Sequence, residues 1–341
     1  MSNGSIAFDL EICSAISARL EQCGVSRDAL LGAYSTATHH GTSFCVELIQ
    51  RGDVAESAIY AAIADLLGLE FTNEALPSRI FVSGEEKPSA FIDVGQVMVL
   101  GADGSSYLYI APSENRIRKL RDHILATPQL KSRIRICTPT LLKQIMRQRH
   151  QKDLIARAHE MTPQSFSAAR VLDTPQAFII AMAIYAFFAC VFNWPTMTLL
   201  VLHVALSVFF FGCVMIRLFA AVSGRRLKFL EIRKCNPRDL PNYSVLVPLY
   251  REQEVIGQLI TSLKRLNWPA SKLDIKLVCE KDDFDTVSAI RRERLPLNFE
   301  LVLVPSGGPK TKPKALNYAL QFARGEIVAV FDAEDRPHPD Q

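Results

Sequence analysis

The sequence lacks the features that mark several large classes of protein. Its 8 cysteines are scattered and none forms a CxxC pair, which suits a reducing compartment. The formal net charge is only +4, so we expect no nucleic acid as a partner. The first 22 residues have neither a basic start nor a long apolar run, and we expect no secretory signal there. Hydrophobic residues form 49% of the 341 residues, enough for two or three domains with their own cores.

Two long apolar runs, 177–194 and 196–216, indicate a membrane protein. They contain 18 and 21 residues without Asp, Glu, Lys or Arg. At about 1.5 Å per residue, each helix can cross a hydrocarbon core of about 30 Å. Trp194 and Pro195 form a short turn between them, with the tryptophan suited to a membrane interface. We therefore expect a transmembrane helical hairpin over 177–222. A buried hairpin in a soluble core is the alternative.

Basic residues lie on both sides of this hairpin and are absent from its turn. They are Arg147, Arg149, Lys152, Arg157 and Arg170 before it, and Arg217, Arg225, Arg226, Lys228, Arg233 and Lys234 after it. Because loops rich in Lys and Arg stay in the cytoplasm, both flanks are predicted to be cytoplasmic. The expected location is a bacterial-type inner (plasma) membrane, multi-pass, with membrane lipids as partners.

Two small regions precede the hairpin. Residues 1–75 place apolar residues at helical spacing, as in "VAESAIYAAIADLLGL", and predict a helical subdomain. Residues 76–150 predict a small α/β subdomain: "QVMVLGADGSSYLYIAPS" alternates around a turn and indicates a β-hairpin, and "ENRIRKLRDHILA" indicates a basic amphipathic helix. A basic linker over 151–176 and a second linker over 223–240 are expected to flank the hairpin.

The segment "ELIQRGDVAESAIYAAIADLLGLEF" resembles the N-terminal domain of type II secretion and pilus assembly ATPases, over roughly residues 10–150. Some members bind cyclic di-GMP through paired Arg-Leu-Gly motifs. The matching positions here, Ser43-Phe44-Cys45 and Ala15-Ile16-Ser17, lack the arginines. The P-loop spacing GxxxxGK[ST] is also absent, so no ATPase activity is expected. The resemblance implies a small interaction domain for a cytosolic protein partner, with cyclic-dinucleotide sensing as the alternative.

The last hundred residues alternate between strands and helices. "YSVLVPL", "DIKLVCE", "FELVLVP" and "EIVAVFD" predict buried strands, and amphipathic helical segments separate them. This alternation is typical of a parallel, doubly wound α/β sheet. Ligands bind such sheets beyond the carboxyl ends of the strands, so the polar residues that follow each strand are the candidates for a site.

Three carboxylates, Asp332, Glu334 and Asp335, follow the last predicted strand. They repel one another unless a cation neutralises them, and hard oxygen ligands suit Mg²⁺ or Mn²⁺ with phosphate oxygens completing the shell. Lys312 and Lys314 precede a helix in the same layer and could hold those phosphates. A solvated acidic turn is the alternative, but acidic groups also follow two other strands. The pattern therefore predicts a site for a divalent metal and a phosphate.

The segments "SVLVPLYREQEVIGQLITSL", "KLVCEKDDFDT", "TKPKALNYAL" and "GEIVAVFDAEDRPHPDQ" resemble family 2 glycosyltransferases of the GT-A fold, in particular membrane-bound enzymes like cellulose synthase. The resemblance implies an incomplete GT-A sheet, the donor-binding half of the domain, over 241–341. It implies transfer of a sugar from a nucleotide-sugar donor, expected to be UDP-linked. The acceptor would be a polysaccharide or lipid-linked, and transfer would be a metal-dependent, inverting step.

The resemblance also implies the residues that bind the donor. They are Pro248, Tyr250, Glu252, Glu280, Asp282, Asp283 and Lys312. Pro248 and Tyr250 would lie beside the nucleotide base. Glu280, with one of the two aspartates that follow it as rival, would contact uracil or ribose. Lys312 would approach the diphosphate.

Asp332 and Glu334 stand at the metal positions of the family's DxD motif, with Asp335 as the rival of Glu334. Lys314 replaces a glycine of the family pattern. The acceptor half of a GT-A domain, with its acidic base and "QxxRW" segment, has no counterpart in these residues. We therefore expect the 341-residue chain to bind little or no donor and to transfer no sugar alone. The alternative function is a non-enzymatic regulatory or assembly subunit whose N-terminal domain binds a partner or a cyclic dinucleotide.

Overall fold

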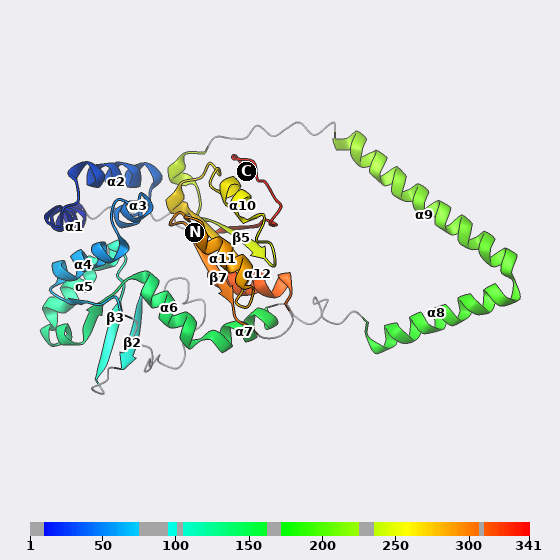
Figure 1. The fold of residues 1–341 in the computed structure, drawn as a ribbon, viewed down its shortest axis with the longest axis horizontal. Helices are drawn as coiled ribbons and strands as arrows, with labels where there is room; N and C mark the ends of the chain where they lie inside the picture. The colour runs from blue at the N-terminus through cyan, green and yellow to red at the C-terminus, as the bar shows by residue number, and fades with distance from the viewer. Residues whose placement is uncertain (1–9, 75–94, 101–104, 162–171, 225–234, 307–309) are drawn as a thin grey trace. The chain divides into compact units, whose positions relative to one another are not determined.

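A computed structural model describes residues 10–74, 95–100, 105–161, 172–224, 235–306 and 310–341 (Figure 1). The chain divides into two compact units. The first joins Met1–Met161 to Cys235–Gln341, and the second is Thr162–Lys234. The first unit therefore contains both the N-terminal region and the segment that carries the predicted donor site.

The N-terminal region begins with helices and continues into a small mixed sheet. Its elements are α1 (Leu10–Gln22), α2 (Arg27–His40), α3 (Phe44–Gln50), α4 (Glu56–Leu67), β1 (Glu70–Phe71), β2 (Gln96–Leu100), β3 (Ser106–Ile110), α5 (Glu114–Ala126), β4 (Ile134–Ile136) and α6 (Pro139–Arg149). The strand order is β1-β4-β3-β2. The predicted hairpin is confirmed, since β2 and β3 pair antiparallel from Gln96 opposite Ile110 to Leu100 opposite Ser106. The helix predicted from "ENRIRKLRDHILA" is α5.

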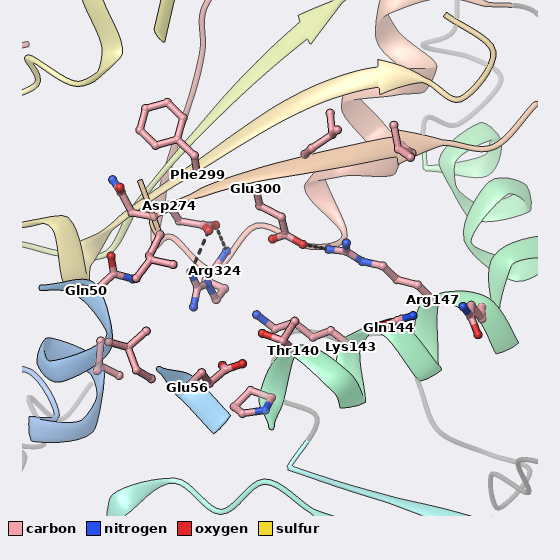
Figure 2. A pocket seen from close by; sticks show the side chains of 18 of the residues that line it. Gln50, Glu56, Thr140, Lys143, Gln144, Arg147, Asp274, Phe299, Glu300 and Arg324 are labelled. Carbon is pink, nitrogen blue, oxygen red and sulfur yellow. Dashed lines mark hydrogen bonds and ion pairs between the residues drawn. The ribbon is translucent and has the colours of Figure 1, made fainter. Parts of the chain in front are cut away.

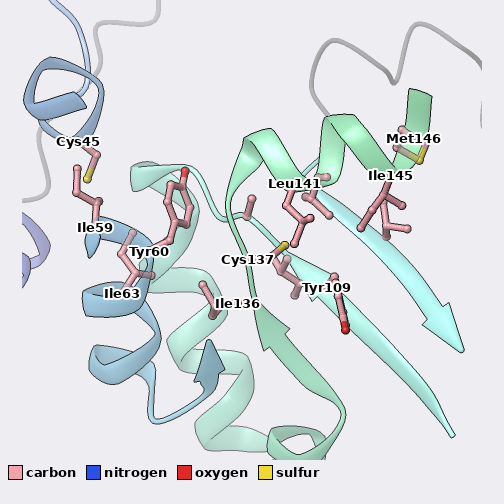
Figure 3. Packing of buried hydrophobic residues seen from close by; sticks show 14 of the residues in the cluster. Cys45, Ile59, Tyr60, Ile63, Tyr109, Ile136, Cys137, Leu141, Ile145 and Met146 are labelled. Carbon is pink, nitrogen blue, oxygen red and sulfur yellow. The ribbon is translucent and has the colours of Figure 1, made fainter. Parts of the chain in front are cut away.

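The predicted boundary between residues 75 and 76 does not separate two cores. β1 comes from the helical part and pairs in parallel with β4 of the α/β part. Figure 3 shows Ile59 and Ile63 of α4 in one cluster with Ile136 of β4 and Leu141 of α6, and all four side chains are buried. A seven-residue helix such as α3 and a two-residue strand cannot bury an apolar face alone, so the two parts share one core.

The predicted linker over 151–176 begins with a helix instead, α7 (Gln151–Glu160). Its Leu154 and Ala158 are buried, at 0% and 2% exposure. The side chain of Asn317 donates a hydrogen bond to the carbonyl of Ala158 at 3.0 Å, and Gln321 donates to the carbonyl of Leu154 at 3.0 Å. The Ala158 carbonyl lies in the last turn of α7, where carbonyls have no intrahelical partner. α7 is therefore docked on the C-terminal part of the same unit.

The C-terminal segment forms the parallel sheet that the sequence predicts. Its elements are β5 (Tyr243–Leu249), α10 (Ile256–Leu263), β6 (Leu273–Glu280), α11 (Phe284–Arg292), β7 (Phe299–Val304), α12 (Lys312–Leu320) and β8 (Ile327–Val330). The strand order is β7-β6-β5-β8, and every pairing is parallel. Val245 and Val247 pack in the cluster that contains α10 and α11, whereas Leu246 packs in the cluster that contains α12. Successive side chains of a strand face opposite sides, so helices cover both faces.

β8 is more exposed than the sequence predicts. Ile327 and Val330 are 50% and 45% exposed. Among the described strands, β8 pairs with β5 alone. An apolar run predicts a strand but does not distinguish a central strand from an edge strand, and this is why the expectation of a buried strand is wrong.

The second unit contains two apolar helices, α8 (Thr174–Asn193) and α9 (Pro195–Gly224). They meet at Trp194, the predicted turn, and diverge from it (Figure 1). The side chain of Gln176 accepts a hydrogen bond from the backbone N–H of Asp173 at 3.2 Å, and this capping box fixes the start of α8. By length and composition both helices can cross a membrane. Their mean hydropathies are 2.0 and 2.6, and none of the residues in the apolar stretch of either helix is buried.

Candidate functional site

The strand order of the C-terminal sheet locates a crevice before any side chain is considered. The chain runs from β5 to β6 to β7 in one direction, and β8 then lies on the opposite side of β5. In open parallel sheets, ligands bind at such a switch point, outside the carboxyl ends of the strands. A pocket of about 590 Å³ lies there, formed by the ends of β5 and β6, the start of α12 and the segment after β8. This volume is typical of small-molecule sites.

Most of the predicted site residues line this pocket. They are Pro248, Tyr250, Glu252, Glu280, Lys312, Asp332 and Glu334. Pro248 and Asp332 are far apart in the sequence, and the parallel pairing of β5 with β8 brings their strands together. Lys310 and Thr311 also line the pocket and were not predicted. Their signal was present in the sequence, because they directly precede Lys312 at the start of α12.

Asp282, Asp283 and Asp335 do not line the pocket, and each has another partner. Asp282 pairs with Lys310, whose ammonium holds the pKa of that carboxyl below its usual value. Asp335 accepts a hydrogen bond at 2.7 Å from the backbone N–H of Asp332. Part of the hydrogen-bonding capacity of the Asp335 carboxylate is thus used within its own turn.

Asp283 holds the turn after β5 in place from outside the lining of the pocket. Its carboxylate accepts hydrogen bonds from the N–H of Thr286, at 3.4 Å, and from the N–H of Arg251, at 2.6 Å. Arg251 has φ of 58°, the left-handed conformation that non-glycine residues rarely adopt. The N–H of Glu252 donates to the Thr286 hydroxyl at 3.1 Å. The first turn of α11 therefore fixes the turn after β5, which carries Tyr250 and Glu252 into the pocket.

Glu280 and Lys314 form a buried ion pair at the end of β6. The Lys314 Nζ lies 3.1 Å from one carboxylate oxygen of Glu280 and 3.4 Å from the other, and both side chains are about 5% exposed. Glu280 lines the pocket and Lys314 does not. Lys314 therefore compensates the charge of Glu280 from outside the lining of the pocket.

The remaining charges of the pocket are mostly negative. Burial raises the pKa of Glu252, and the negative charges of Asp332 and Glu334 raise it further, while Lys312 lowers it. One carboxylate oxygen of Glu252 is buried and has no hydrogen-bond partner in the part of the chain that the structure describes. Lys312 pairs with Asp332. Because Lys310 pairs with Asp282, the carboxylates of Glu252, Asp332 and Glu334 are left with Lys312 as their compensating lysine. A divalent cation fits this excess of negative charge.

The acidic side chains do not form a preformed metal cage. Among the residues that the structure describes, no group of three or more Asp, Glu, His or Cys side chains is arranged to hold a metal ion. Asp332 and Glu334 both face the pocket, so they fit a cation whose shell is completed by phosphate oxygens and water.

The positions that match the cyclic-dinucleotide motifs are occupied by other contacts. The carboxylate of Glu114 accepts hydrogen bonds from the Ser43 hydroxyl at 2.7 Å and from the N–H of Cys45 at 3.2 Å. Phe44 between them is 1% exposed, and Ile16 at the other motif is 0% exposed. An anionic ligand at the start of α3 would meet a carboxylate, so the geometry gives no support to a nucleotide site there.

Comparison with known proteins gives matches to glycosyltransferases. Residues 244–341 match the family described as "Glycosyl transferase family 2". The probable glycosyltransferase YdaM of Bacillus subtilis is 28% identical over 104 residues, which are 30% of this chain and 25% of that protein. The cellulose synthase catalytic subunit (UDP-forming) of Pseudomonas fluorescens is 31% identical over 113 residues, 30% of this chain and 14% of that protein.

A solved structure also matches, that of the mannosyltransferase PcManGT from Pyrobaculum calidifontis in complex with GDP-Man and Mn²⁺. It is 32% identical, covers 38% of each chain and has a TM-score of 0.31. The chain spans a quarter or less of the length of the two curated relatives above. The family match begins at residue 244, so the likeness of the N-terminal region to secretion ATPases stays a prediction. The segment that forms the candidate site, residues 244–341, is the part of the chain that matches the glycosyltransferase family 2 model.

Proposed function

We propose that residues 241–341 bind the nucleoside diphosphate part of a nucleotide-sugar donor for a membrane-anchored glycosyltransferase. The observation that carries this proposal is the convergence of seven assigned residues in one pocket at the switch point of the sheet. The family match over 244–341 supports the same reaction class. The acceptor is a growing polysaccharide or a lipid-linked sugar, and the donor is UDP-linked.

The ion pair between Lys312 and Asp332 explains how a metal diphosphate would bind. In the structure the two side chains neutralise each other. A diphosphate with its metal offers an anion to Lys312 and a cation to Asp332, so binding exchanges one ion pair for two. Glu334, and Asp335 as its rival, would complete the protein's share of the ligands. Tyr250, which is 42% exposed, offers an aromatic face to the base.

The residues of the pocket also suit the chemistry of transfer. A bound Mg²⁺ or Mn²⁺ would neutralise the leaving nucleoside diphosphate. Lys312 stabilises the negative charge that develops on that group as the acceptor hydroxyl attacks the anomeric carbon. Attack and departure on opposite faces of the sugar invert the configuration at that carbon. Glu280 accepts a hydrogen bond from ribose or uracil while Lys314 compensates its charge.

A binding measurement tests this proposal directly. Mn²⁺ bound to a large complex enhances the relaxation of water protons, and this signal detects weak binding. A sensitive signal is needed because the sequence predicts that this chain binds little or no donor. We expect enhancement when UDP is added to the chain with Mn²⁺. We expect Asp332→Ala to weaken that binding at least tenfold, or about 1.4 kcal/mol.

The matched control is Asp285→Ala, which removes an exposed aspartate of α11 outside the pocket. Its binding should equal that of the unchanged chain. Asp335→Ala, compared with Glu334→Ala, identifies the second metal ligand. Equal enhancement for Asp332→Ala and the unchanged chain would remove the metal-diphosphate site from the proposal.

We propose that α8 and α9 anchor the protein in a membrane as a hairpin with both flanks in the cytoplasm. The length and exposure of the two apolar helices support this. In a cysteine-free background, a cysteine at Asn193 should react with an impermeant maleimide in intact cells. Cys235 restored alone should react only after the cells are opened. The same accessibility for both positions would contradict the hairpin.

A further inference from the structure

A second cavity lies between the N-terminal region and the sheet of the same unit. Its volume is about 720 Å³, and it shares no lining residue with the donor pocket. Figure 2 shows Lys143 and Arg147 extending from α6 on one side, and Asp274, Glu300 and Arg324 on the other. Nothing in the donor site uses these residues.

An ion network forms the sheet side of this cavity. Lys276, at 1% exposure, lies 2.8 Å from Asp274 and also pairs with Glu300. Arg324 donates to Asp274 at 3.0 Å, and Arg147 of α6 pairs with Glu300. Three cations therefore share two carboxylates, so the network carries an excess positive charge.

Lys143 adds a further cation to this excess. It stands one turn before Arg147 on α6, and both side chains line the cavity. Within the described part of the chain, Lys143 has neither a hydrogen bond nor an ion pair. Among the same described residues, the buried Nε of Arg147 has no hydrogen-bond partner.

The other charged residues of the lining, Glu56 and Lys281, cancel each other in sign. The cavity and its network thus keep two uncompensated positive charges. Enclosing an excess of positive charge costs free energy unless an anion compensates it.

We infer that this cavity binds a small phosphate-bearing anion through Lys143, Arg147 and Arg324. A phosphate group offers three acceptor oxygens, which suit donors that come from separate elements, and Arg and Lys are the usual phosphate partners. The side chains of Gln144 and Asn298 supply neutral donors, and the rings of Tyr60 and Tyr318 line the rest. The volume leaves room for an organic group beyond the phosphate, such as that of a nucleoside monophosphate. Because both regions contribute donors, the ligand would fasten α6 to the sheet.

The charge state of Lys143 gives the binding a pH signature. Burial lowers the pKa of Lys143 to about 8, helped by Arg324 and Lys276, while Glu300 and Asp274 oppose the shift. Glu56 of α4 and Lys281 also line the cavity that Lys143 faces. The ammonium is therefore mostly charged at pH 7 and loses its proton as pH rises through about 8. Phosphate affinity should fall between pH 7 and pH 9, while a phosphate ester stays a dianion.

Thermal unfolding of the full chain in detergent, with EDTA present, tests the inference. EDTA removes divalent metal ions and so prevents metal-dependent binding at the donor site. The probes are inorganic phosphate and AMP, each compared with sodium chloride at equal ionic strength. We expect both probes, but not chloride, to raise the unfolding temperature at pH 7 and to lose this effect at pH 9.

Lys143→Gln should weaken binding at least tenfold without lowering the unfolding temperature of the ligand-free chain, because among the described residues this lysine makes no hydrogen bond or ion pair that the change would remove. Lys119→Gln, at an exposed position on α5, is the matched control and should bind as the unchanged chain does. Asp332→Ala should also retain the phosphate effect, which separates this site from the donor site. Absence of a shift at 50 mM probe (roughly fifty times a millimolar Kd), or an equal shift in Lys143→Gln, overturns the inference.

Discussion

Replacing Lys276 by methionine tests the buried ion network most directly. Its ammonium lies between Asp274 and Glu300, and the side chain is 1% exposed. Methionine has a similar length and no charge, so the change removes the cation and leaves the two carboxylates in place. Each carboxylate keeps one arginine: Arg324 lies 3.0 Å from Asp274, and Arg147 pairs with Glu300.

The expected loss follows from this geometry. Removing one partner of a buried ion pair destabilises a protein by about 3–5 kcal/mol, because an uncompensated charge stays behind. The two arginines compensate part of that charge, and the methionine buries apolar surface. We therefore expect Lys276→Met to lower the free energy of unfolding by about 3 kcal/mol, at the lower end of that range. Such a loss is a large fraction of the free energy of unfolding of a typical domain, which is about 5–15 kcal/mol.

The chain offers a fluorescent reporter for this measurement. It has 2 tryptophans, and Trp194→Phe leaves Trp268 alone. The indole of Trp268 donates to the carbonyl of Pro241 at 3.3 Å, and its ring lies 5.4 Å from that of Tyr243, at the start of the sheet. Urea unfolding followed by Trp268 emission therefore reports on the part of the fold that contains the network.

Lys264→Met is the matched control, since Lys264 is exposed and its Nζ donates to one carbonyl, that of Arg294, at 3.1 Å. It should change the free energy of unfolding by less than about 0.5 kcal/mol. A loss below about 1 kcal/mol for Lys276→Met would show that water or other groups already compensate the carboxylates. The inference that Lys276 is needed to compensate the two carboxylates would then be wrong.

Three further predictions concern stability. The network lowers the pKa of Asp274 and of Glu300 to about 2 each, against the opposing effect of burial. These two carboxylates contribute fully to the free energy of unfolding at pH values above their pKa values in the unfolded chain, 3.8 and 4.5. The free energy of unfolding should therefore fall by several kcal/mol as pH drops from 5 to 2, at about 1.4 kcal/mol for each unit by which folding lowers a pKa. A flat acid titration of stability would contradict this. The double change Asn317→Ala and Gln321→Ala should lower the free energy of unfolding by about 1 kcal/mol for each hydrogen bond lost, and it should speed amide exchange in α7. Unchanged amide exchange would refute this prediction. Gly325→Ala places a Cβ 2.3 Å from the backbone nitrogen of Ser244. We therefore expect the free energy of unfolding, measured in urea, to fall by more than about 3 kcal/mol. A variant as stable as the unchanged chain would show that this close contact is wrong.

Local patterns in the sequence were sufficient for much of the fold. The largely apolar segments "YSVLVPL" and "DIKLVCE" predicted β5 and β6, because a strand between two helical layers is buried on both faces. The spacing in "ENRIRKLRDHILA" predicted α5, and the alternation on both sides of a turn predicted the β2–β3 hairpin. Polar residues at the ends of predicted strands gave Tyr250, Glu252, Glu280, Asp332 and Glu334 of the pocket, since the end of a strand is itself a local feature. Lys312 came from the start of a predicted helix, and Pro248 came from the family resemblance alone.

Other features depend on which segments meet. Lys314 contacts Glu280, and α7 packs on α12, through pairings between residues distant in the chain. Exposure of β8 depends on having a single neighbour among the described strands, and the cavity beside Lys143 exists only where α6 meets the sheet. The sequence by itself determined the strands of the C-terminal sheet, the helix α5, the apolar hairpin and the acidic strand end, because periodicity and composition act over a few residues. The tertiary structure alone decided which charges are paired and which are left over, because an ion pair depends on distance in space.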